Sequence, residues 1–280
     1  MTSQTDLTQQ PIPPNSAYAD LNGLRLYYEV SGKGSPLFLL PGGMGSTKMF
    51  SKIIPTLSEG RQVVAVDLQA HGRTADIDRP LSFEVLADDI AALAEHLGFH
   101  RVDVMGYSMS GGIALQVAAR RPDLVRKVVL VSFPFERNGW HNDIRAGMDQ
   151  VRSESASSMI GSPPHAEYMA VAPKPEDWPK LVGRVGDLMR LPFDWRDLVS
   201  ALTAPVLLVY GDADFMSPGH AAEFFALLGG GLKDGKWDGS GMSRSALAVL
   251  PRQTHYTIFA CPLLPVVACT FLDERAPTGS

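Results

Sequence analysis

A serine at the apex of a tight turn is the residue of this chain best suited to nucleophilic chemistry. Residues 102–113 contain the segment GYSMSGG, in which an apolar run breaks at Gly106 and a helix-forming run begins directly after Ser108. A sharp turn from strand to helix needs small neighbours, and it places the free N–H groups of the helix beside the serine oxygen. The segment therefore predicts that Ser108 is a nucleophile at a strand-turn-helix elbow.

Asp214 and His255 can supply the two further groups that an activated serine requires. A serine hydroxyl is a poor nucleophile at neutral pH, so it needs a base, and the base needs a carboxylate that fixes its tautomer. Asp214 follows the apolar run 205–210, and His255 follows the apolar run 246–250. Because the carboxyl ends of parallel strands form the ligand-binding edge of an open α/β sheet, we expect Ser108, Asp214 and His255 to meet there.

Two further loops, and the order of these three residues, resemble the α/β-hydrolase superfamily. Residues 67–74 (DLQAHGRT) are similar to its D-x-x-G-x-G-x-S turn, and residues 39–43 (LLPGG) resemble its L-x-H-G-x oxyanion loop. Serine, aspartate and histidine also occur here in the order that this fold uses. The resemblance extends over residues 17–272 and implies an α/β-hydrolase fold.

The resemblance also implies an oxyanion hole, made by the backbone N–H groups of Gly43 and of Met109, the residue after the nucleophile. Three places depart from the family pattern: Ser110 stands where glycine is usual, Pro41 where histidine is usual, and Arg252 and Gln253 where small residues are common. A serine at position 108 argues against the haloalkane dehalogenases and epoxide hydrolases of the superfamily, whose chemistry uses an aspartate there.

Two other carboxylates compete with Asp214 for the role of the acid. Asp212 lies in the same Gly-Asp-Ala-Asp segment, but in the family pattern the later aspartate carries the role. Glu136 follows another predicted strand, at a place where some relatives carry the acid. Among the other histidines, His71 lies in a tight turn, where a structural role is the expected one.

Strands and helices alternate along most of the chain, which predicts an α/β fold with a mostly parallel central sheet and helices on both faces. Alternating apolar residues predict a hairpin over 17–31, and short apolar runs predict buried strands. Ser82 is placed to cap a helix that begins at residue 83. The remaining strands are expected at 36–40, 62–68, 101–105, 127–132, 205–210 and 246–250, and the helices at 47–57, 83–97, 109–121, 218–228 and 262–272.

The segment 134–197 interrupts this alternation and is much longer than a usual connection between two core elements. Apolar residues at helical spacing over 142–156 and 177–190 predict two to four helices, which would form a cap over the active edge. The predicted division is therefore a core of residues 17–133 and 198–273, a helical cap of residues 134–197 inserted in it, and flexible tails at 1–16 and 274–280.

The cap segment is rich in large apolar side chains, with three of the four tryptophans and four of the eleven methionines. Most of them are expected to attach the cap to the body. Those that face the active edge are expected to line a pocket for an apolar acyl or alcohol group. The candidates for such a pocket are Met44, Tyr107, Phe135, Trp140, Met148 and Trp178.

Composition excludes several classes of function. The chain has 280 residues, a hydrophobic content of 45% and a net charge of −5, which suits one large soluble domain and gives no electrostatic basis for binding nucleic acid or an anionic membrane. Cys261 and Cys269 lack metal-ligand spacing and favour a reduced, cytoplasmic protein. We also expect no secretory signal and no membrane span.

These observations predict a serine hydrolase that needs no metal or cofactor and has a small molecule as its partner. It would cleave an ester or lactone of a small, partly apolar substrate through an acyl-enzyme. The same three residues would also serve C–C bond hydrolysis or cofactor-free perhydrolysis and haloperoxidation. A hydrolase-like receptor or pseudoenzyme that binds a small ligand is the alternative from another class, and turnover of a short p-nitrophenyl ester separates it from an enzyme. The substrate stays open, because a fold does not fix it.

Overall fold

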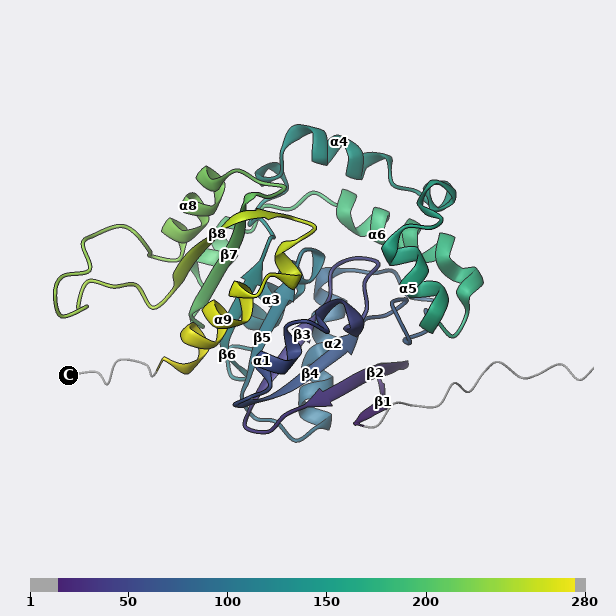
Figure 1. Cartoon of the computed structure of the whole chain (residues 1–280), viewed down its shortest axis with the longest axis horizontal. Helices are drawn as coiled ribbons and strands as arrows, with labels where there is room; N and C mark the ends of the chain where they lie inside the picture. The colour runs from purple at the N-terminus through teal and green to yellow at the C-terminus, as the bar shows by residue number, and fades with distance from the viewer. Residues whose placement is uncertain (1–14, 275–280) are drawn as a thin grey trace, which may run out of the picture.

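The computed structural model describes residues 15–274, which are built around one eight-stranded sheet (Figure 1). The order of strands across the sheet is β1-β2-β4-β3-β5-β6-β7-β8. β1 and β2 form the antiparallel hairpin, β2 pairs antiparallel with β4, and the remaining neighbours are parallel. The predicted mostly parallel sheet is confirmed. The strands are β1 (Ser16–Leu21), β2 (Leu24–Ser31), β3 (Ser35–Leu40), β4 (Arg61–Asp67), β5 (Val102–Tyr107), β6 (Val125–Val131), β7 (Val206–Ala213) and β8 (Ala246–Thr254).

Helices cover both faces of the sheet, because successive side chains of a buried strand point to opposite faces and both need apolar cover. Phe38 and Val104 face a core shared with α2, α3 and α8. Leu39 and Met105, their neighbours in sequence, face a second core shared with α1 and α9. These helices are α1 (Ile54–Leu57), α2 (Phe83–His96), α3 (Met109–Arg120), α8 (Pro218–Leu227) and α9 (Leu263–Asp273).

The helical insertion predicted between two core strands is present between β6 and β7. Figure 1 shows its main helices together at one end of the sheet. In α6, the side chains predicted to share one face are all buried, including Leu181, Val185 and Met189. The insertion consists of α4 (Asn142–Gln150), α5 (Pro163–Val171), α6 (Trp178–Arg190) and α7 (Arg196–Ser200), with 3-10 turns η2 (Arg137–Gly139), η3 (Ser153–Met159) and η4 (Pro175–Asp177).

The limits of the predicted domains stay a prediction, since no boundary in the structure fixes them. α7 runs across the predicted end of the cap at residue 197, and β1 begins at Ser16, inside the predicted N-terminal tail. Residues 1–14 of that tail and residues 275–280 of the C-terminal one lie outside the described residues.

The two predicted elements that differ most in extent from the observed ones are the helix at 47–57 and the strand at 246–250. The helix expected over 47–57 is divided into η1 (Thr47–Phe50) and α1. Pro55 has no N–H to donate to the preceding turn, so it fits only in the first turn of a new helix. The strand expected to end at residue 250 continues as β8 to Thr254. β8 lies at the edge of the sheet, where Pro251 is tolerated, and Arg252 has a positive φ of 57° beside a shift in register.

Candidate active site

Ser108 lies at the turn between β5 and α3, in a backbone conformation that few non-glycine residues adopt. Its φ is 53° and its ψ is −129°, a strained combination that persists only where the surroundings hold it. Its N–H donates to the carbonyl of Val131 over 2.8 Å. A Cβ at Gly106 would lie 2.0 Å from the carbonyl oxygen of Ser110, so this position requires glycine. The predicted elbow is therefore present, with Ser108 half-buried at its apex.

The structure brings the three predicted site residues together. Ser108 Oγ lies 2.9 Å from His255 Nε2, and His255 Nδ1 lies 2.9 Å from Asp214 Oδ1. The two pairs are 147 and 41 positions apart in sequence, so only the sheet makes them neighbours. With Asp214 ionised, His255 donates from Nδ1, and its Nε2 can accept the proton of Ser108. This is the arrangement of a nucleophile, a base and an acid that orients the base.

The Asp214 carboxylate is buried and hydrogen-bonded at both oxygens. Oδ1 also accepts from the N–H of Phe215 over 2.7 Å, while Oδ2 accepts from the Ser132 hydroxyl and from the N–H of Gly211 over 3.1 Å. Burial by itself would raise the pKa of this carboxyl, but the hydrogen bond and charge of His255, with the bonds from Ser132 and Gly211, hold the pKa below its ordinary value. Asp214 therefore stays charged at neutral pH and can stabilise an imidazolium.

Two aromatic residues hold His255. The Phe215 ring stacks on the imidazole with 3.7 Å between ring centroids and an interplanar angle of 6°. The buried Tyr107 hydroxyl donates to the backbone carbonyl of His255 over 2.6 Å. Tyr107, which the sequence suggested as a pocket residue, thus contacts the histidine loop directly.

Neither rival carboxylate contacts His255 within the described residues. Asp212 is exposed and accepts from the N–H of Gln253 over 3.2 Å. Glu136 lies 3.9 Å from Arg196, away from the histidine. The geometry therefore favours Asp214 as the acid.

Residues 41–47, named here the glycine loop, lie against the elbow. A Cβ placed on Gly42 would be 3.2 Å from the Cβ of Ser108, and one placed on Gly43 would be 3.8 Å from the Cβ of Met109. Within residues 15–274, neither the N–H of Gly43 nor that of Met109 donates to an acceptor. The two residues predicted to carry the oxyanion donors thus lie beside the elbow, and neither N–H is paired with another described group.

Two of the departures from the family pattern, Ser110 and Pro41, contact each other. The buried hydroxyl of Ser110 donates to the carbonyl of Pro41. This bond connects the first turn of α3 to the start of the glycine loop.

Three of the pocket candidates in the cap are buried in contacts between protein groups. Phe135 stacks on His220 with 4.4 Å between centroids, and Trp140 packs edge-on against Phe133 at 5.7 Å. Trp178 donates from Nε1 to a backbone carbonyl inside the cap over 3.3 Å. These contacts attach the cap to the body or its own parts to one another. A role toward substrate stays a prediction for Met44, Tyr107, Phe135, Trp140, Met148 and Trp178.

Sequence reasoning missed Ser132 and Phe215 at the site, and an aromatic cluster beneath the cap. Ser132 directly follows β6, so its place at the ligand-binding edge was a signal that could have indicated it. Phe215 adjoins Asp214, but its stacking on the histidine has no local signature. The aromatic cluster packs the cap against the body, and the centroids of its contacting rings are 4.7 to 6.0 Å apart. Its members are Phe83, Phe133, Trp140, Phe193 and Trp195.

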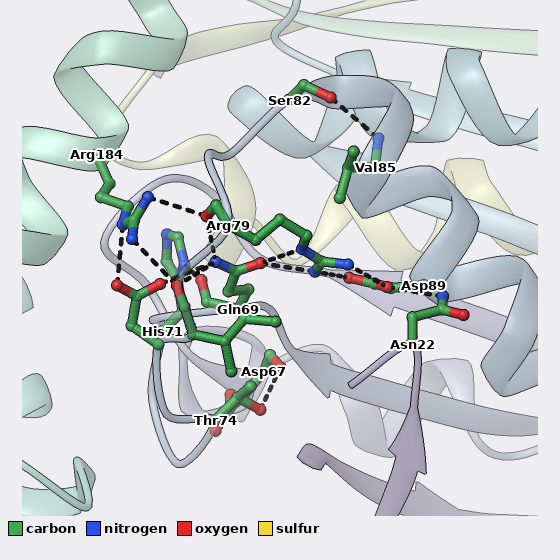
Figure 2. A network of polar contacts seen from close by, with 12 residues as sticks. Asn22, Asp67, Gln69, His71, Thr74, Arg79, Ser82, Val85, Asp89 and Arg184 are labelled. Carbon is green, nitrogen blue, oxygen red and sulfur yellow. Dashed lines mark hydrogen bonds and ion pairs between the residues drawn. The ribbon is translucent and has the colours of Figure 1, made fainter. Parts of the chain in front are cut away.

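A polar network lies beside the D-x-x-G-x-G-like turn, where Arg79 bridges Gln69 and Asp89 (Figure 2). His71 is fully buried in the same turn, with Nδ1 2.8 Å from the carbonyl of Gln69. Burial lowers the pKa of His71 to about 4, so its imidazole is neutral. Ser82 caps α2, as the sequence predicts, by accepting from the N–H of Val85 over 3.1 Å.

The chain is similar to several known proteins. Residues 35–157 match the family described as the alpha/beta hydrolase fold. The chain is 32% identical over 219 residues to the serine hydrolase BPHL of Mus musculus, covering 75% of this chain and 74% of that protein. The chain belongs to the α/β-hydrolase family. A soluble epoxide hydrolase of Corynebacterium sp. (strain C12) is 34% identical over 116 residues, covering 40% of each protein. The crystal structure of E-2-(acetamidomethylene)succinate hydrolase superposes with a TM-score of 0.71 at 20% identity, over 92% of this chain and 99% of that one, and shows the shared fold.

Among the described residues, no group of three or more His, Cys, Asp or Glu side chains could hold a metal ion. Cys261 and Cys269 are free thiols. Across residues 15–274, no helix combines the length and apolar character needed to span a membrane.

Proposed function

We propose that this α/β-hydrolase is a serine hydrolase that cleaves an ester or lactone of a small, partly apolar substrate. The observation that carries the proposal is the hydrogen-bonded series of Ser108, His255 and Asp214 at the carboxyl ends of the strands. Each of its two contacts is 2.9 Å long. The unpaired N–H groups of Gly43 and Met109 beside it suit the oxygen of a tetrahedral intermediate.

Acylation begins when Ser108 Oγ attacks the substrate carbonyl carbon and His255 Nε2 takes the hydroxyl proton. The carbonyl oxygen gains negative charge and accepts from the N–H groups of Gly43 and Met109. The intermediate then collapses, and the C–O bond to the leaving group breaks. His255 returns the proton to the departing alcohol oxygen, which in a lactone stays attached to the acyl chain. Asp214 stabilises the imidazolium between these two transfers.

Deacylation repeats the sequence with water as the nucleophile. His255 Nε2 takes a proton from water as the water oxygen attacks the acyl carbon, and the oxyanion again faces Gly43 and Met109. When the acyl bond to Ser108 breaks, His255 protonates Oγ and the free acid leaves. His255 therefore serves as base and then as acid in both halves, and water is the second substrate.

Ser108 at the elbow supports acyl transfer. The name of one relative, an epoxide hydrolase, implies a different reaction, the opening of an epoxide ring. The match to the epoxide hydrolase covers 40% of the chain. A serine forms a neutral acyl ester that water attacks at the carbonyl, which is the chemistry of ester and lactone cleavage. The wider match to a protein named a serine hydrolase agrees with this reading.

The test combines turnover with covalent labelling. The purified protein is assayed for hydrolysis of p-nitrophenyl acetate, butyrate and hexanoate, of a panel of aliphatic lactones, and of a substrate with a cleavable C–C bond. Peracid formation from acetate and hydrogen peroxide is measured as well. In parallel, a fluorophosphonate probe is applied and the labelled peptide is identified by mass spectrometry. We expect ester or lactone turnover and labelling at Ser108 alone.

Other results would redirect the proposal. Labelling at Ser110, or none at all, contradicts Ser108 as the nucleophile. Labelling at Ser108 with turnover restricted to the C–C substrate or to peracid formation replaces the ester reaction by one of those. Ligand binding without labelling or turnover indicates a receptor.

A further inference from the structure

The glycine loop carries one proposed oxyanion donor, and side chains from elsewhere in the chain hold it. Within the loop, the N–H of Gly45 donates to the carbonyl of Gly42 over 3.0 Å. Ser110 bonds the carbonyl of Pro41 at its start. At its end, the N–H of Thr47 donates to the fully buried Asp67 carboxylate over 2.7 Å. Both of these contacts come from the body of the fold.

The cap contacts the loop between these two points. The hydroxyl of Ser46, which is 2% exposed, donates to the carboxylate of Glu167 on α5, a residue 121 positions away. Ser46 Oγ also accepts from the N–H of Lys48 over 3.3 Å, so its hydroxyl hydrogen is committed to Glu167. A Cβ on Gly43 would lie 3.0 Å from Cγ1 of the buried Val185 on α6. The cap therefore contacts the loop through a hydrogen bond at Ser46 and an apolar contact at Gly43.

Charged groups fix α6 to the body beside this contact. The Arg184 Nε lies 2.9 Å from Asp76 Oδ2, and its other nitrogens donate to the carbonyls of Arg79 and Ile77 over 2.9 and 3.1 Å (Figure 2). Lys180, one turn earlier, lies 2.6 Å from the same carboxylate. Because Arg184 fixes α6 to the body, its neighbour in sequence, Val185, is held against Gly43.

We propose that Glu167 is a positioning residue of the reaction, and that the cap through it completes the oxyanion hole. The inference rests on the proposed function, because it concerns the donor N–H of Gly43. A glycine-rich segment has wide conformational freedom, and a donor displaced by a fraction of an ångström loses much of its contact with a developing oxyanion. Glu167 acts on the loop three residues from that donor, and it does not itself touch the substrate.

Two substitutions at position 167 separate the hydrogen bond from the charge. Glu167→Gln keeps an oxygen that can accept from Ser46. Glu167→Ala removes this acceptor, so the buried Ser46 hydroxyl loses its hydrogen-bond partner on the cap. Glu176→Ala is the matched control, since Glu176 is an exposed carboxylate of the same cap. The primary readout is the rate at which a fluorophosphonate labels Ser108, which needs the oxyanion hole but no identified substrate. The second is kcat and KM on the best ester found, with inhibition by phenylboronic acid as an analogue of the tetrahedral state.

We expect Glu167→Ala to slow labelling and lower kcat about 10-fold with little change in KM, and to weaken boronic acid inhibition by a similar factor. Glu167→Gln and Glu176→Ala should stay within about 2-fold of the wild type, with the folded fraction checked by near-UV circular dichroism. Equal labelling by Glu167→Ala, a loss confined to KM, or a loss that follows the unfolded fraction overturns the inference while the proposed function stands. If Ser108 of the wild type is not labelled, both are overturned.

Discussion

The catalytic edge and the cap are held in place by different kinds of interaction. Ser108, Asp214 and His255 each lie within one residue of the end of a strand, and the parallel ladder of β5 to β8 sets their relative positions. In the described part of the chain, an isolated backbone bridge between Trp140 and Met216 joins the cap to the body, and no ladder of several residue pairs does so. The cap is also attached by an aromatic cluster, by the bonds of Arg184 and by the contact between Glu167 and Ser46.

This difference indicates which substitutions should affect chemistry and which should affect selection. Backbone hydrogen bonds of a buried sheet tolerate side-chain changes, so the three site residues keep their geometry when distant residues change. Side-chain contacts are lost one at a time, so the cap can shift over a site that stays assembled. Substitutions at the catalytic edge should therefore lower the rate more than substitutions in the cap.

Ser108→Ala should lower kcat by ~10⁴-fold or more, because no other group can form the acyl bond. The measurement is steady-state hydrolysis of the best ester, with melting temperature and circular dichroism showing that the fold is kept. Activity that survives in this variant would place the nucleophile elsewhere.

Asp214→Asn should lower kcat by ~10³–10⁴-fold, because an amide can hold the imidazole in the wrong tautomer. Asp212→Asn is the matched control two residues away and should have a much smaller effect, as its side chain is exposed. A reversed order, or a loss seen only with Glu136→Gln, would mean that the carboxylate has been assigned to the wrong residue.

Acid should destabilise the seam between cap and body through His220. Burial lowers the pKa of this histidine from 6.5 to about 4, so the folded state disfavours its charged form. The stability that the neutral ring contributes is fully present well above pH 6.5 and is lost as the pH falls from 6.5 toward 4.

Removing this ionisation should flatten the response. His220→Phe keeps a ring against Phe135, and urea unfolding at pH 7 and 4.5 should show a smaller difference than in the wild type. The exposed His100→Gln is the control and should match the wild type. The comparison between variants is needed because Asp67 has the opposite pH dependence. Burial raises the pKa of Asp67 to about 7, so the stability that this group contributes is lost as the pH rises through 7. An unchanged difference in His220→Phe would contradict this assignment.

Trp140→Ala should change substrate preference and leave the chemistry working. Trp140 packs on Phe133 at the base of the cap, so its loss should alter the space available to an acyl group. We expect ratios of kcat/KM between long and short p-nitrophenyl esters to change by ~10–100-fold, while acetate turnover largely persists. Loss of all activity in a folded variant would mean that the cap carries a catalytic group.

Arg184→Met should loosen α6 with the smallest effect of the series. The substitution removes three hydrogen-bonding nitrogens and leaves the nearly buried Asp76 with Lys180 and the side-chain amide of Gln69. Hydrogen exchange should become faster in residues 178–190, and ester turnover should fall by ~2–5-fold. Lys180→Met should have smaller effects on hydrogen exchange and turnover, because Lys180 is half-exposed and contributes one contact to Asp76. Equal exchange in both variants and the wild type would mean that other contacts hold the helix.

The sequence by itself determined the features that depend on neighbours along the chain. Glycines around Ser108 predict an elbow, the run before Asp214 predicts a strand, and apolar spacing predicts the buried face of α6. Each of these is a local rule of period or backbone freedom, and the structure bears out the elements concerned.

Only the tertiary structure decided which distant side chains meet. Ser132 reaches Asp214 across 82 positions, and Ser46 reaches Glu167 across 121. Neither pair has a signature in composition or periodicity, because hydroxyls and carboxylates are common at the surface and their pairing depends on where the sheet and the cap bring the backbone. The chemistry of the site could therefore be predicted from short motifs, whereas the support of its acid and of its glycine loop emerges only when the chain is folded.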